Sequence, residues 1–379
     1  VLGERRGEGR VGRVLDYTRV APRAAARCPH FGACGGCALQ HLTDESYAAA
    51  KIEWLAASLR QHGLDPHVLR PLRRLHPGTR RRARFALARG KDGAPHVGFH
   101  ARASPRVVDM TNCAVLHPAI TTLVPRLRAL LPAILALDKA ASATATLADT
   151  GIDLLLDLPA PPGLASLEAM AAFARQSALA RLAWRRAGGQ PMPVALLHPV
   201  RIAFAGVAVD LPYDAFLQAS AETDAVLTEA ACEGAAGARR IAELYAGVGT
   251  FTFALAKLAP VHAVEGDAAA LAALRAAAER TRLPITAERR DLERRPLAAA
   301  ELAPFDTVVF DPPRAGAKSQ SEALAQSAVR RIVALSCNPA TFARDARALV
   351  AGGFRLVAVE AFDPFVWSTH LELVARFER

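Results

Sequence analysis

A single cysteine, Cys337, lies just past an apolar run, Arg331–Leu335, that is typical of a buried β-strand. In an open α/β sheet, ligands bind in the crevice beyond the carboxyl ends of the strands, so a thiol placed there can meet a substrate. A thiolate is a strong nucleophile that adds reversibly to an electrophilic carbon. The alternative is that Cys337 is a small buried hydrophobic residue, as most free cysteines are. Other motifs in the chain favour the nucleophile.

A second group of cysteines is spaced for a metal site. Cys28, Cys34 and Cys37 form a C-x5-C-x2-C run whose glycines let the backbone wrap tightly around a ligand, and Cys113 follows downstream. In a cytosolic chain such clustering indicates metal or cluster ligation rather than disulfides, with reduced structural thiols as the alternative. Four thiolates suit either tetrahedral zinc or an iron–sulfur cluster, and the spacing alone does not choose between them.

The stretch 243–253 (ELYAGVGTFTF) has the pattern of a strand, a glycine turn and the start of a helix, which lets a nucleotide-like ligand lie against the backbone. The third glycine of the dinucleotide fingerprint is missing. Glu265 ends the next predicted strand, where a carboxylate can bind both ribose hydroxyls, and Asp291 is placed to accept from an adenine amino group. These features fit NAD and S-adenosylmethionine.

The turn Asp311–Arg314 (DPPR) favours S-adenosylmethionine. An Asp-Pro-Pro turn after the fourth strand of such a unit is a methyltransferase signature, and a dehydrogenase has no use for it. Versions of the turn that end in an aromatic residue hold an amino group for N-methylation, whereas Arg314 follows here. Together with Cys337, two elements later, the turn predicts carbon methylation of a pyrimidine.

The elements that must position these residues alternate between strands and helices. Strands are predicted near 240–245, 261–265, 284–288, 305–310, 330–336, 353–362 and 369–377. This alternation predicts a mostly parallel α/β sheet. Upstream, Ser46–Arg60 has the period of an amphipathic helix, and 201–211 alternates as a hairpin around Gly206. The segment 114–199 shows no chemical motif, and we expect it to be scaffold.

The charge of the chain favours a polyanionic partner. Its 379 residues, enough for two domains, carry a net charge of +11, and nucleic acid is the commonest partner for such a surface. Arginines crowd between Arg70 and Arg84, where a strand could follow a phosphate backbone or present a solvated face. The chain offers neither the apolar run of a signal peptide at its start nor an apolar stretch of about 18 residues. We expect a soluble, cytoplasmic protein that does not enter membranes.

Taken together, these motifs resemble those of the RNA 5-methyluridine methyltransferases, and most closely their iron–sulfur-containing 23S ribosomal RNA branch. The resemblance extends from about Arg13 to the C-terminus. It rests on the C-x5-C-x2-C run with Cys113, on Phe216–Gln218, on the loop 245–251, on Glu265, on Asp291, on Asp311–Arg314, on 336–339 and on 370–372.

For the fold, the resemblance implies an α/β chain in three parts. Residues 1–27 would be the remnant of an N-terminal β-barrel of the TRAM (OB-like) type, which the family usually has in full. Residues 28–200 would be a central α+β domain with a [4Fe–4S] site and an RNA-contacting surface, and the helix at 46–60 could pack on the next domain. Residues 201–379 would be a Rossmann-like class I S-adenosylmethionine-dependent methyltransferase domain.

The resemblance also implies roles for single residues. The four cysteines would hold the [4Fe–4S] cluster, Cys337 would be the nucleophile, and Glu372 would be the base that removes the C5 proton. Phe216 and Arg314 are candidates to contact the flipped uridine, although Phe216 could equally be a core residue. The S-adenosylmethionine site would be lined by Gln218, Tyr245, Thr250, Glu265, Asp291 and Asp311. Thr250 departs from the family, which commonly has asparagine there.

Three other functions compete with this one. A 5-methylcytidine enzyme normally carries a second cysteine beside the Asp-Pro-Pro position, and none is present. A nicotinamide dehydrogenase would leave the DPPR turn and Cys337 unexplained. A non-catalytic RNA-binding protein should have lost Cys337 or Glu372. We therefore predict a monomeric RNA (uracil-C5)-methyltransferase that acts on 23S ribosomal RNA or, as the alternative, on uridine 54 of transfer RNA.

Overall fold

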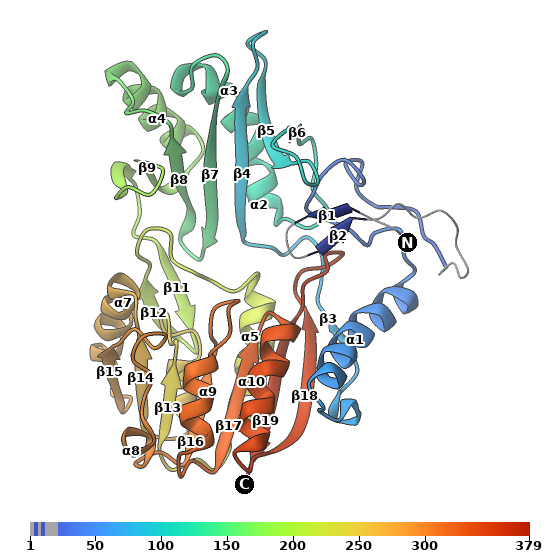
Figure 1. The fold of residues 1–379 in the computed structure, drawn as a ribbon. Coiled ribbons are helices and arrows are strands. Elements are labelled where there is room, and N and C mark those ends of the chain that lie inside the picture. Colours follow the sequence, from blue (N-terminus) through green and yellow to red (C-terminus); the bar gives the residue numbers. More distant parts are fainter. Residues whose placement is uncertain (1–3, 7–8, 12–21) are drawn as a thin grey trace.

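The computed structural model describes residues 4–6, 9–11 and 22–379. Its fold is dominated by two large β-sheets that lie one beyond the other along the molecule (Figure 1). The predicted barrel remnant at 1–27 falls mostly outside the described residues. Within it the structure gives strands β1 (Glu4–Arg6) and β2 (Gly9–Val11), which pair antiparallel.

The first sheet spans residues 82–196 in the strand order β10-β9-β8-β7-β4-β5-β6. Its strands are β4 (Arg82–Arg89), β5 (Pro95–His100), β6 (Val107–Asp109), β7 (Lys139–Ala148), β8 (Gly151–Leu158), β9 (Leu179–Arg186) and β10 (Met192–Leu196). Strands β8 and β9 are parallel and therefore need a crossover, which helix α4 (Leu164–Gln176) supplies. Helices α2 (Pro118–Thr121) and α3 (Leu123–Ile134) pack with α4 into the core of this sheet.

The two faces of the first sheet differ because side chains alternate along a strand. In β8, Leu154 and Leu156 belong to the core under the helices. Asp153 and Asp157 have the opposite parity, and the register sets them across from arginines of β9. The face away from the helices is therefore charged.

The second sheet has the order β15-β14-β13-β16-β17-β19-β18-β3. Its strands are β3 (Arg73–Arg74), β13 (Ile241–Leu244), β14 (Val261–Glu265), β15 (Ile285–Arg289), β16 (Thr307–Phe310), β17 (Arg331–Ser336), β18 (Arg355–Asp363) and β19 (Glu372–Glu378). Strands β13 to β17 run parallel, and β19 is antiparallel to both neighbours. The strands predicted between 240 and 377 are all present, so the predicted α/β sheet is confirmed.

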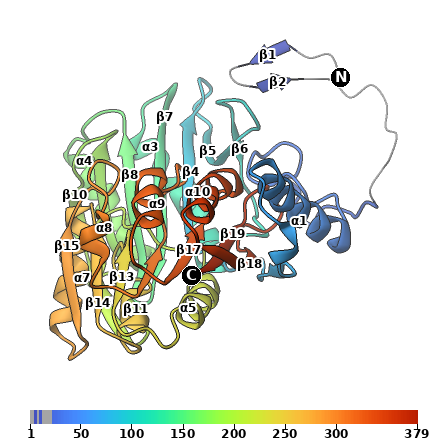
Figure 2. The same cartoon turned by 60° about the horizontal axis from the view of Figure 1, so that its bottom comes forward.

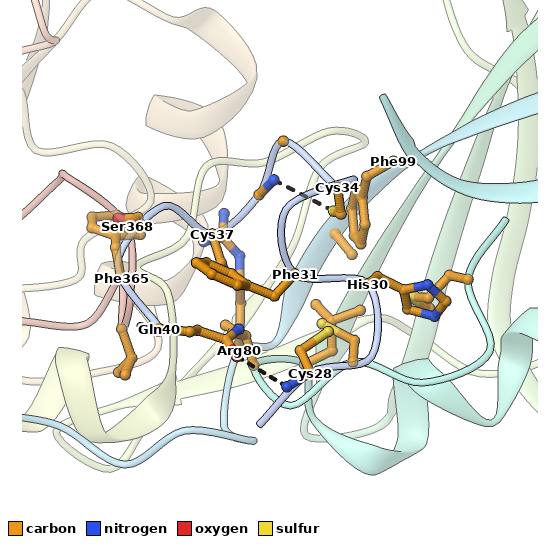
Figure 3. Close-up of a pocket in the computed structure, with 18 of the residues that line it drawn as sticks. Cys28, His30, Phe31, Cys34, Cys37, Gln40, Arg80, Phe99, Phe365 and Ser368 are labelled. Carbon is orange, nitrogen blue, oxygen red and sulfur yellow. Dashed lines mark hydrogen bonds between the residues drawn. The ribbon is translucent and has the colours of Figure 1, made fainter. Parts of the chain in front are cut away.

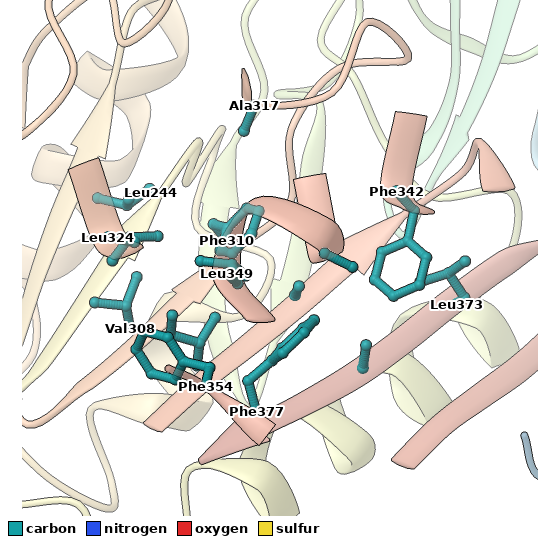
Figure 4. Packing of buried hydrophobic residues seen from close by; sticks show 14 of the residues in the cluster. Leu244, Val308, Phe310, Ala317, Leu324, Phe342, Leu349, Phe354, Leu373 and Phe377 are labelled. Carbon is teal, nitrogen blue, oxygen red and sulfur yellow. The ribbon is translucent and has the colours of Figure 1, made fainter. Parts of the chain in front are cut away.

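Helices cover both faces of the second sheet. One face is covered by α5 (Ala221–Gly234), α6 (Thr252–Leu255) and α7 (Ala268–Glu279). The other is covered by α8 (Ala299–Leu302), α9 (Lys318–Ala325) and α10 (Pro339–Ala351). Figure 4 shows part of the core under α8, α9 and α10, where Leu349, Phe354 and Phe377 lie between helix α10 and the sheet. The strand order reverses between β13 and β16, and such a fold binds ligands beyond the carboxyl ends of these strands.

Helix α1 (Asp44–Gln61) belongs to the second sheet, although it precedes the first one in sequence. Its N-cap Thr43 accepts a hydrogen bond from the first turn. Leu55 and Leu59 are fully buried in the same core as α10, and α1 lies beside β18 in both views (Figures 1 and 2). The helix predicted at 46–60 is thus confirmed. A 3-10 turn (Pro66–Val68) leads from α1 to β3.

A hairpin connects the two sheets along the chain. Strands β11 (Arg201–Phe204) and β12 (Val207–Asp210) pair antiparallel around Gly206, as predicted, and pack against α7. Within the described part of the chain, no helix is both long enough and apolar enough to cross a bilayer.

Candidate active site

A cavity of about 1210 Å³ lies at the carboxyl ends of the parallel strands. From the second sheet it is lined by residues that follow β13, β14, β15, β16 and β17. The first sheet contributes Arg181 and Arg185 of β9 and the turn Gly188–Pro191. Small-molecule sites usually measure about 300–1,000 Å³, so this cavity has room for a cofactor together with part of a second substrate.

The glycine turn after β13 shapes one wall of the cavity. Gly247 has a φ of 56°, and nothing lies within 4 Å of where its Cβ would stand. At Gly249, with φ 98°, a Cβ would stand 2.6 Å from the ring of Phe253, so this position requires glycine. Tyr245 also has a positive φ, 63°, and lines the cavity. The turn therefore leaves open space against the backbone, which a nucleotide-like ligand requires.

Two predicted carboxylates stand at the ends of the next strands. Glu265 ends β14, and its two oxygens accept backbone N–H groups of Gly247 over 2.8 Å and of Asp267 over 2.6 Å. Asp291 follows β15 and accepts from the backbone N–H of Glu293 over 3.1 Å. Both line the cavity. Backbone hydrogen bonds thus hold each carboxylate at the cavity wall before any ligand binds.

Asp311, after the end of β16, is a partly buried residue whose carboxyl contacts the loop after β12. Gln218 Nε2 donates to Asp311 Oδ2 over 3.1 Å. Arg81 holds this loop, because its Nε donates to the carbonyl of Gln218 over 3.1 Å and its guanidinium pairs with Asp224 at 2.6 Å. Burial raises the pKa of Asp311 to about 7, and the bond from Gln218 opposes that shift.

Cys337 and Glu372 meet at the edge of the same cavity. The antiparallel register of β17 and β19, extended by one residue, sets them opposite each other. Burial, with the carboxyls of Glu372 and Asp311, raises the pKa of the Cys337 thiol to about 11, while Arg314 opposes the rise. Burial and Asp311 also raise the pKa of Glu372 well above its ordinary value. The thiol therefore lies among two carboxyls, of which Glu372 is buried and Asp311 partly buried, and one guanidinium.

Asn338 ties the cysteine segment to the DPPR turn. Its Nδ2 donates to the carbonyl of Arg314 over 3.0 Å, and its Oδ1 accepts from Ala340 N over 3.2 Å at the start of α10. Thr341 Oγ1 also donates to the Arg314 carbonyl, over 3.2 Å. The two motifs are therefore held in a fixed relation to each other.

The structure brings most of the predicted site residues into one cavity. Those that line it are Phe216, Gln218, Tyr245, Glu265, Asp291, Asp311, Arg314, Cys337 and Glu372. Thr250, predicted as a cofactor contact, is not among the residues that line it. Phe216 is 67% exposed, so the alternative of a core residue is wrong.

The four cysteines that were predicted to hold a metal or cluster line a second cavity, of about 520 Å³ (Figure 3). Cys28, Cys34, Cys37 and Cys113 all face it. Burial raises the pKa of Cys37 to about 11, and the other three thiols add to the rise. The loop is closely folded, since a Cβ at Gly35 would stand 2.9 Å from a backbone carbonyl. Among the described residues, no group of three or more His, Cys, Asp or Glu side chains is close enough to hold a metal ion.

The two cavities meet at the nucleophile segment, because Arg314 and Cys337 line both of them. A smaller cavity of about 260 Å³ also adjoins both, and it is lined by Phe216 and by the arginines at 80, 82 and 84. The four cysteines are far from Cys337 in the sequence, yet their cavity reaches it. Part of the predicted arginine-rich segment therefore faces the same crevice.

The first sheet contributes to the site in a way that the sequence did not predict. Arg181 and Arg185 line the main cavity although they belong to the segment 114–199, which we expected to be scaffold only. Arg181 makes two bonds of 2.8 Å to Asp153, and Arg185 bonds Asp157 over 2.5 Å. The sequence carries a signal for the pairing of β8 with β9, since these two strands carry acidic and basic residues at the same spacing of four, but none for their place at the cavity.

Comparisons with known proteins relate this chain to RNA methyltransferases. Residues 201–379 match the family described as tRNA (Uracil-5-)-methyltransferase. A protein of Caulobacter vibrioides described as an uncharacterized RNA methyltransferase is 42% identical over 383 residues, which cover 98% of this chain and 90% of that protein. The 23S rRNA (uracil(1939)-C(5))-methyltransferase RlmD of Alkalilimnicola ehrlichii is 36% identical over 100% of this chain and 88% of its own length.

Among solved structures, the Pyrococcus abyssi tRNA (uracil-54, C5)-methyltransferase, in complex with S-adenosyl-L-homocysteine, superposes with a TM-score of 0.72. The match covers 91% of this chain and 86% of that one, at 23% sequence identity. The two chains therefore share their fold.

Proposed function

This chain belongs to the RNA 5-methyluridine methyltransferase family and is an S-adenosylmethionine-dependent RNA (uracil-C5)-methyltransferase, and we propose that it methylates one uridine of 23S ribosomal RNA through a covalent bond from Cys337. The ribosomal target is supported by RlmD, a relative named for 23S rRNA that aligns with the whole chain. Transfer RNA is the alternative, because the matching family is named for it.

The cofactor site fits S-adenosylmethionine, which when bound supplies a methyl group on a positively charged sulfur. The open space at Gly247 lets the ligand lie against the backbone. Glu265 uses each oxygen once for a backbone N–H, and each still has a free lone pair for a ribose hydroxyl. Asp291 would accept a hydrogen bond from the adenine amino group, and Asp291, Gln218 and Asp311 all line the same cavity.

The reaction follows from the electronics of uracil. The Cys337 thiolate adds to C6, and the C5–C6 electron pair moves toward C5, which becomes enolate-like. C5 then bonds to the methyl carbon while the bond from that carbon to sulfur breaks. Glu372 takes the C5 proton, the C5–C6 double bond re-forms, and the thiolate leaves C6. The raised pKa of Glu372 makes its carboxylate a stronger base for this last proton.

One observation carries the proposal: a half-buried thiol lies opposite a buried carboxyl at the carboxyl edge of the sheet, within the cavity that the glycine turn opens. An N-methyltransferase or a dehydrogenase needs no such pair. Phe216, exposed at the rim between Arg82 and the cofactor cavity, is placed to stack on the flipped uridine or on its neighbour. Arg314, beside Cys337, is placed to contact the base.

We also propose that Cys28, Cys34, Cys37 and Cys113 hold a [4Fe–4S] cluster. The four side chains support this, because all four thiols line one cavity and three of them raise the pKa of the fourth, Cys37. The cluster would link the segment before α1 to the segment after β6, and it would take no part in methyl transfer. We propose further that residues 1–27, 28–200 and 201–379 are the three parts of a cytoplasmic monomer.

The experiment that tests the function maps 5-methyluridine by mass spectrometry in total RNA from cells with and without the gene. The proposal expects one 5-methyluridine to disappear from 23S ribosomal RNA and to return when purified protein and S-adenosylmethionine are added to that RNA. Loss from transfer RNA alone would replace the ribosomal target with the alternative. An unchanged 5-methyluridine map would contradict both.

A further inference from the structure

Lys51 is a fully buried cation that joins helix α1 to the loop before Glu372. Its ammonium donates to Asp363 Oδ1 and to the carbonyl of His370, over 2.5 Å in each case. Neither the Lys51 nor the Asp363 side chain has exposed surface. Asp363 is the last residue of β18, and His370 lies two residues before Glu372. One ammonium group therefore contacts both ends of the loop 364–371.

Tyr47, one turn earlier in α1, holds the middle of the same loop. Its hydroxyl donates to Asp363 Oδ2 over 2.5 Å and accepts the backbone N–H of Trp367 over 2.8 Å. Trp367 has a φ of 62°, a conformation that a bulky residue keeps only where its surroundings impose it. The Trp367 carbonyl accepts backbone N–H groups of Ala38 and Leu39, over 2.8 and 3.0 Å. The loop is thus held at both ends and at its centre.

Stability alone does not account for a lysine at this position. Removing two charges from water offsets much of their attraction, so apolar residues of similar size are often as stable as a buried ion pair. The neighbouring inward residues of α1, Leu55 and Leu59, are apolar and bury in the same way. Lys51 differs from an apolar residue because its two hydrogen bonds fix the distance between the end of β18 and the start of β19.

We propose that Lys51 is a positioning residue for Glu372, which fixes both ends of the loop 364–371 and thereby holds the Glu372 carboxyl where it receives the C5 proton. The inference rests on the proposed function, in which Glu372 is the base. The loop also carries Phe365 and His370. Both line the second cavity, which contains the four predicted cluster ligands and is called the cysteine cavity below, and Cys337 lines it too. A displacement of about 1 Å in such a group lowers a rate about 100-fold.

The test uses the full chain with both charges removed, Lys51→Met with Asp363→Asn. Lys51→Met alone would leave Asp363 buried without its cation and would lower the melting temperature, whereas the double variant removes the unpaired charge and keeps an acceptor for Tyr47. Hydrogen exchange with mass spectrometry is measured on peptides that cover 364–371. We expect at least 10-fold faster exchange there, with unchanged exchange in α10. Unchanged exchange in the loop would overturn the proposal.

The second readout follows the reaction on 23S ribosomal RNA and transfer RNA transcripts with radiolabelled S-adenosylmethionine. A displaced base leaves the C5 proton in place, so the double variant should turn over about 100-fold more slowly and accumulate a methylated covalent adduct on a denaturing gel. Leu302→Ala, which opens a cavity in the core at α8, controls for lost stability and should form no adduct.

Normal turnover without adduct in the double variant would overturn the positioning role. Slow turnover without adduct, equal to that of Leu302→Ala, would also overturn it. If the unaltered protein methylates neither transcript, the proposed function fails instead, and the exchange of 364–371 still decides whether Lys51 fixes the loop.

Discussion

The side chains of Gln218 and Asp311 form a hydrogen bond of 3.1 Å between residues that are 93 positions apart in the sequence. The bond joins the loop after β12 to the DPPR turn, so two motifs that were recognised separately form one wall of the cavity. It also favours the ionised form of Asp311, because an amide N–H donates to a carboxylate. Burial nevertheless raises the pKa of Asp311 to about 7.

Gln218→Ala is expected to weaken S-adenosylmethionine binding about 10-fold at pH 8, since a hydrogen bond to a charged group contributes about 1.5 kcal/mol. Isothermal titration calorimetry measures the effect. Gln326→Ala, an exposed glutamine at the end of α9, is the matched control and should bind normally. Equal affinity of the two variants would show that Gln218 does not serve the cofactor.

Glu243 makes stability depend on pH. It is fully buried in β13, and burial raises its pKa to about 8. A carboxyl whose folded pKa lies above its unfolded value binds more protons when folded, so its contribution falls as the pH rises from about 4 to 8. Groups with lowered pKa values, such as Glu301 at about 2, have already ionised in this range.

Glu243→Gln should therefore gain stability relative to the unaltered protein as the pH rises from 5 to 8, by about 1.4 kcal/mol per pH unit. Urea denaturation at each pH gives this difference. Glu279→Gln, at the exposed end of α7, controls for the replacement of one glutamate by glutamine. A constant difference for Glu243→Gln would rule out a raised pKa in the folded state.

The four cysteines that line one cavity lead us to expect bound iron and sulfide. Protein purified without oxygen should be brown, and Cys113→Ser should lose iron and sulfide because one of the four thiolates is missing. Cys232→Ser removes a thiol on α5 that does not line this cavity, and this variant should keep both iron and sulfide. Stoichiometric zinc without iron in the unaltered protein would contradict the cluster assignment.

The cavity that Glu265 lines should bind S-adenosylmethionine and not NAD. S-adenosylmethionine at 100 times its dissociation constant should stabilise the protein by about 2.7 kcal/mol, and NAD should not. Glu265→Ala should abolish the rise in melting temperature, because Glu265 also holds the glycine turn through Gly247. Equal stabilisation by NAD would argue against the methyltransferase site.

The sequence allowed much of the site to be predicted, because its catalytic motifs lie at strand ends. Each of Glu265, Asp311 and Cys337 follows or ends an apolar run, and parallel strands bring such positions to one edge. The strand positions of the second sheet were predictable for the same reason. Thr250 was the exception, because a position within the glycine turn does not tell which way the side chain faces.

Contacts between elements far apart in sequence were not predictable. Arg181 and Arg185 lie on a strand of the other sheet, and only the docking of the two sheets brings them to the cavity. The hydrogen bond from Lys51 to Asp363 joins residues that are 312 positions apart in the sequence. A lone lysine in an amphipathic helix does not indicate which residue it contacts. The meeting of the cysteine cavity with Cys337 depends on the same long-range packing.

The covalent step is the central claim, and two substitutions should stall it at different points. Cys337→Ala lacks the group that activates C5, so it should form neither 5-methyluridine nor an adduct with RNA. Glu372→Gln keeps the thiol but cannot take the C5 proton, so it should be trapped on its own methylated product.

The most direct measurement is a denaturing gel of each variant with labelled 23S ribosomal RNA and S-adenosylmethionine. We expect a shifted protein–RNA band for Glu372→Gln and none for Cys337→Ala. RNA with 5-fluorouridine at the target should give the same band with the unaltered enzyme, because fluorine cannot leave as a proton does. Methylation by Cys337→Ala, or normal turnover by Glu372→Gln, would contradict the account.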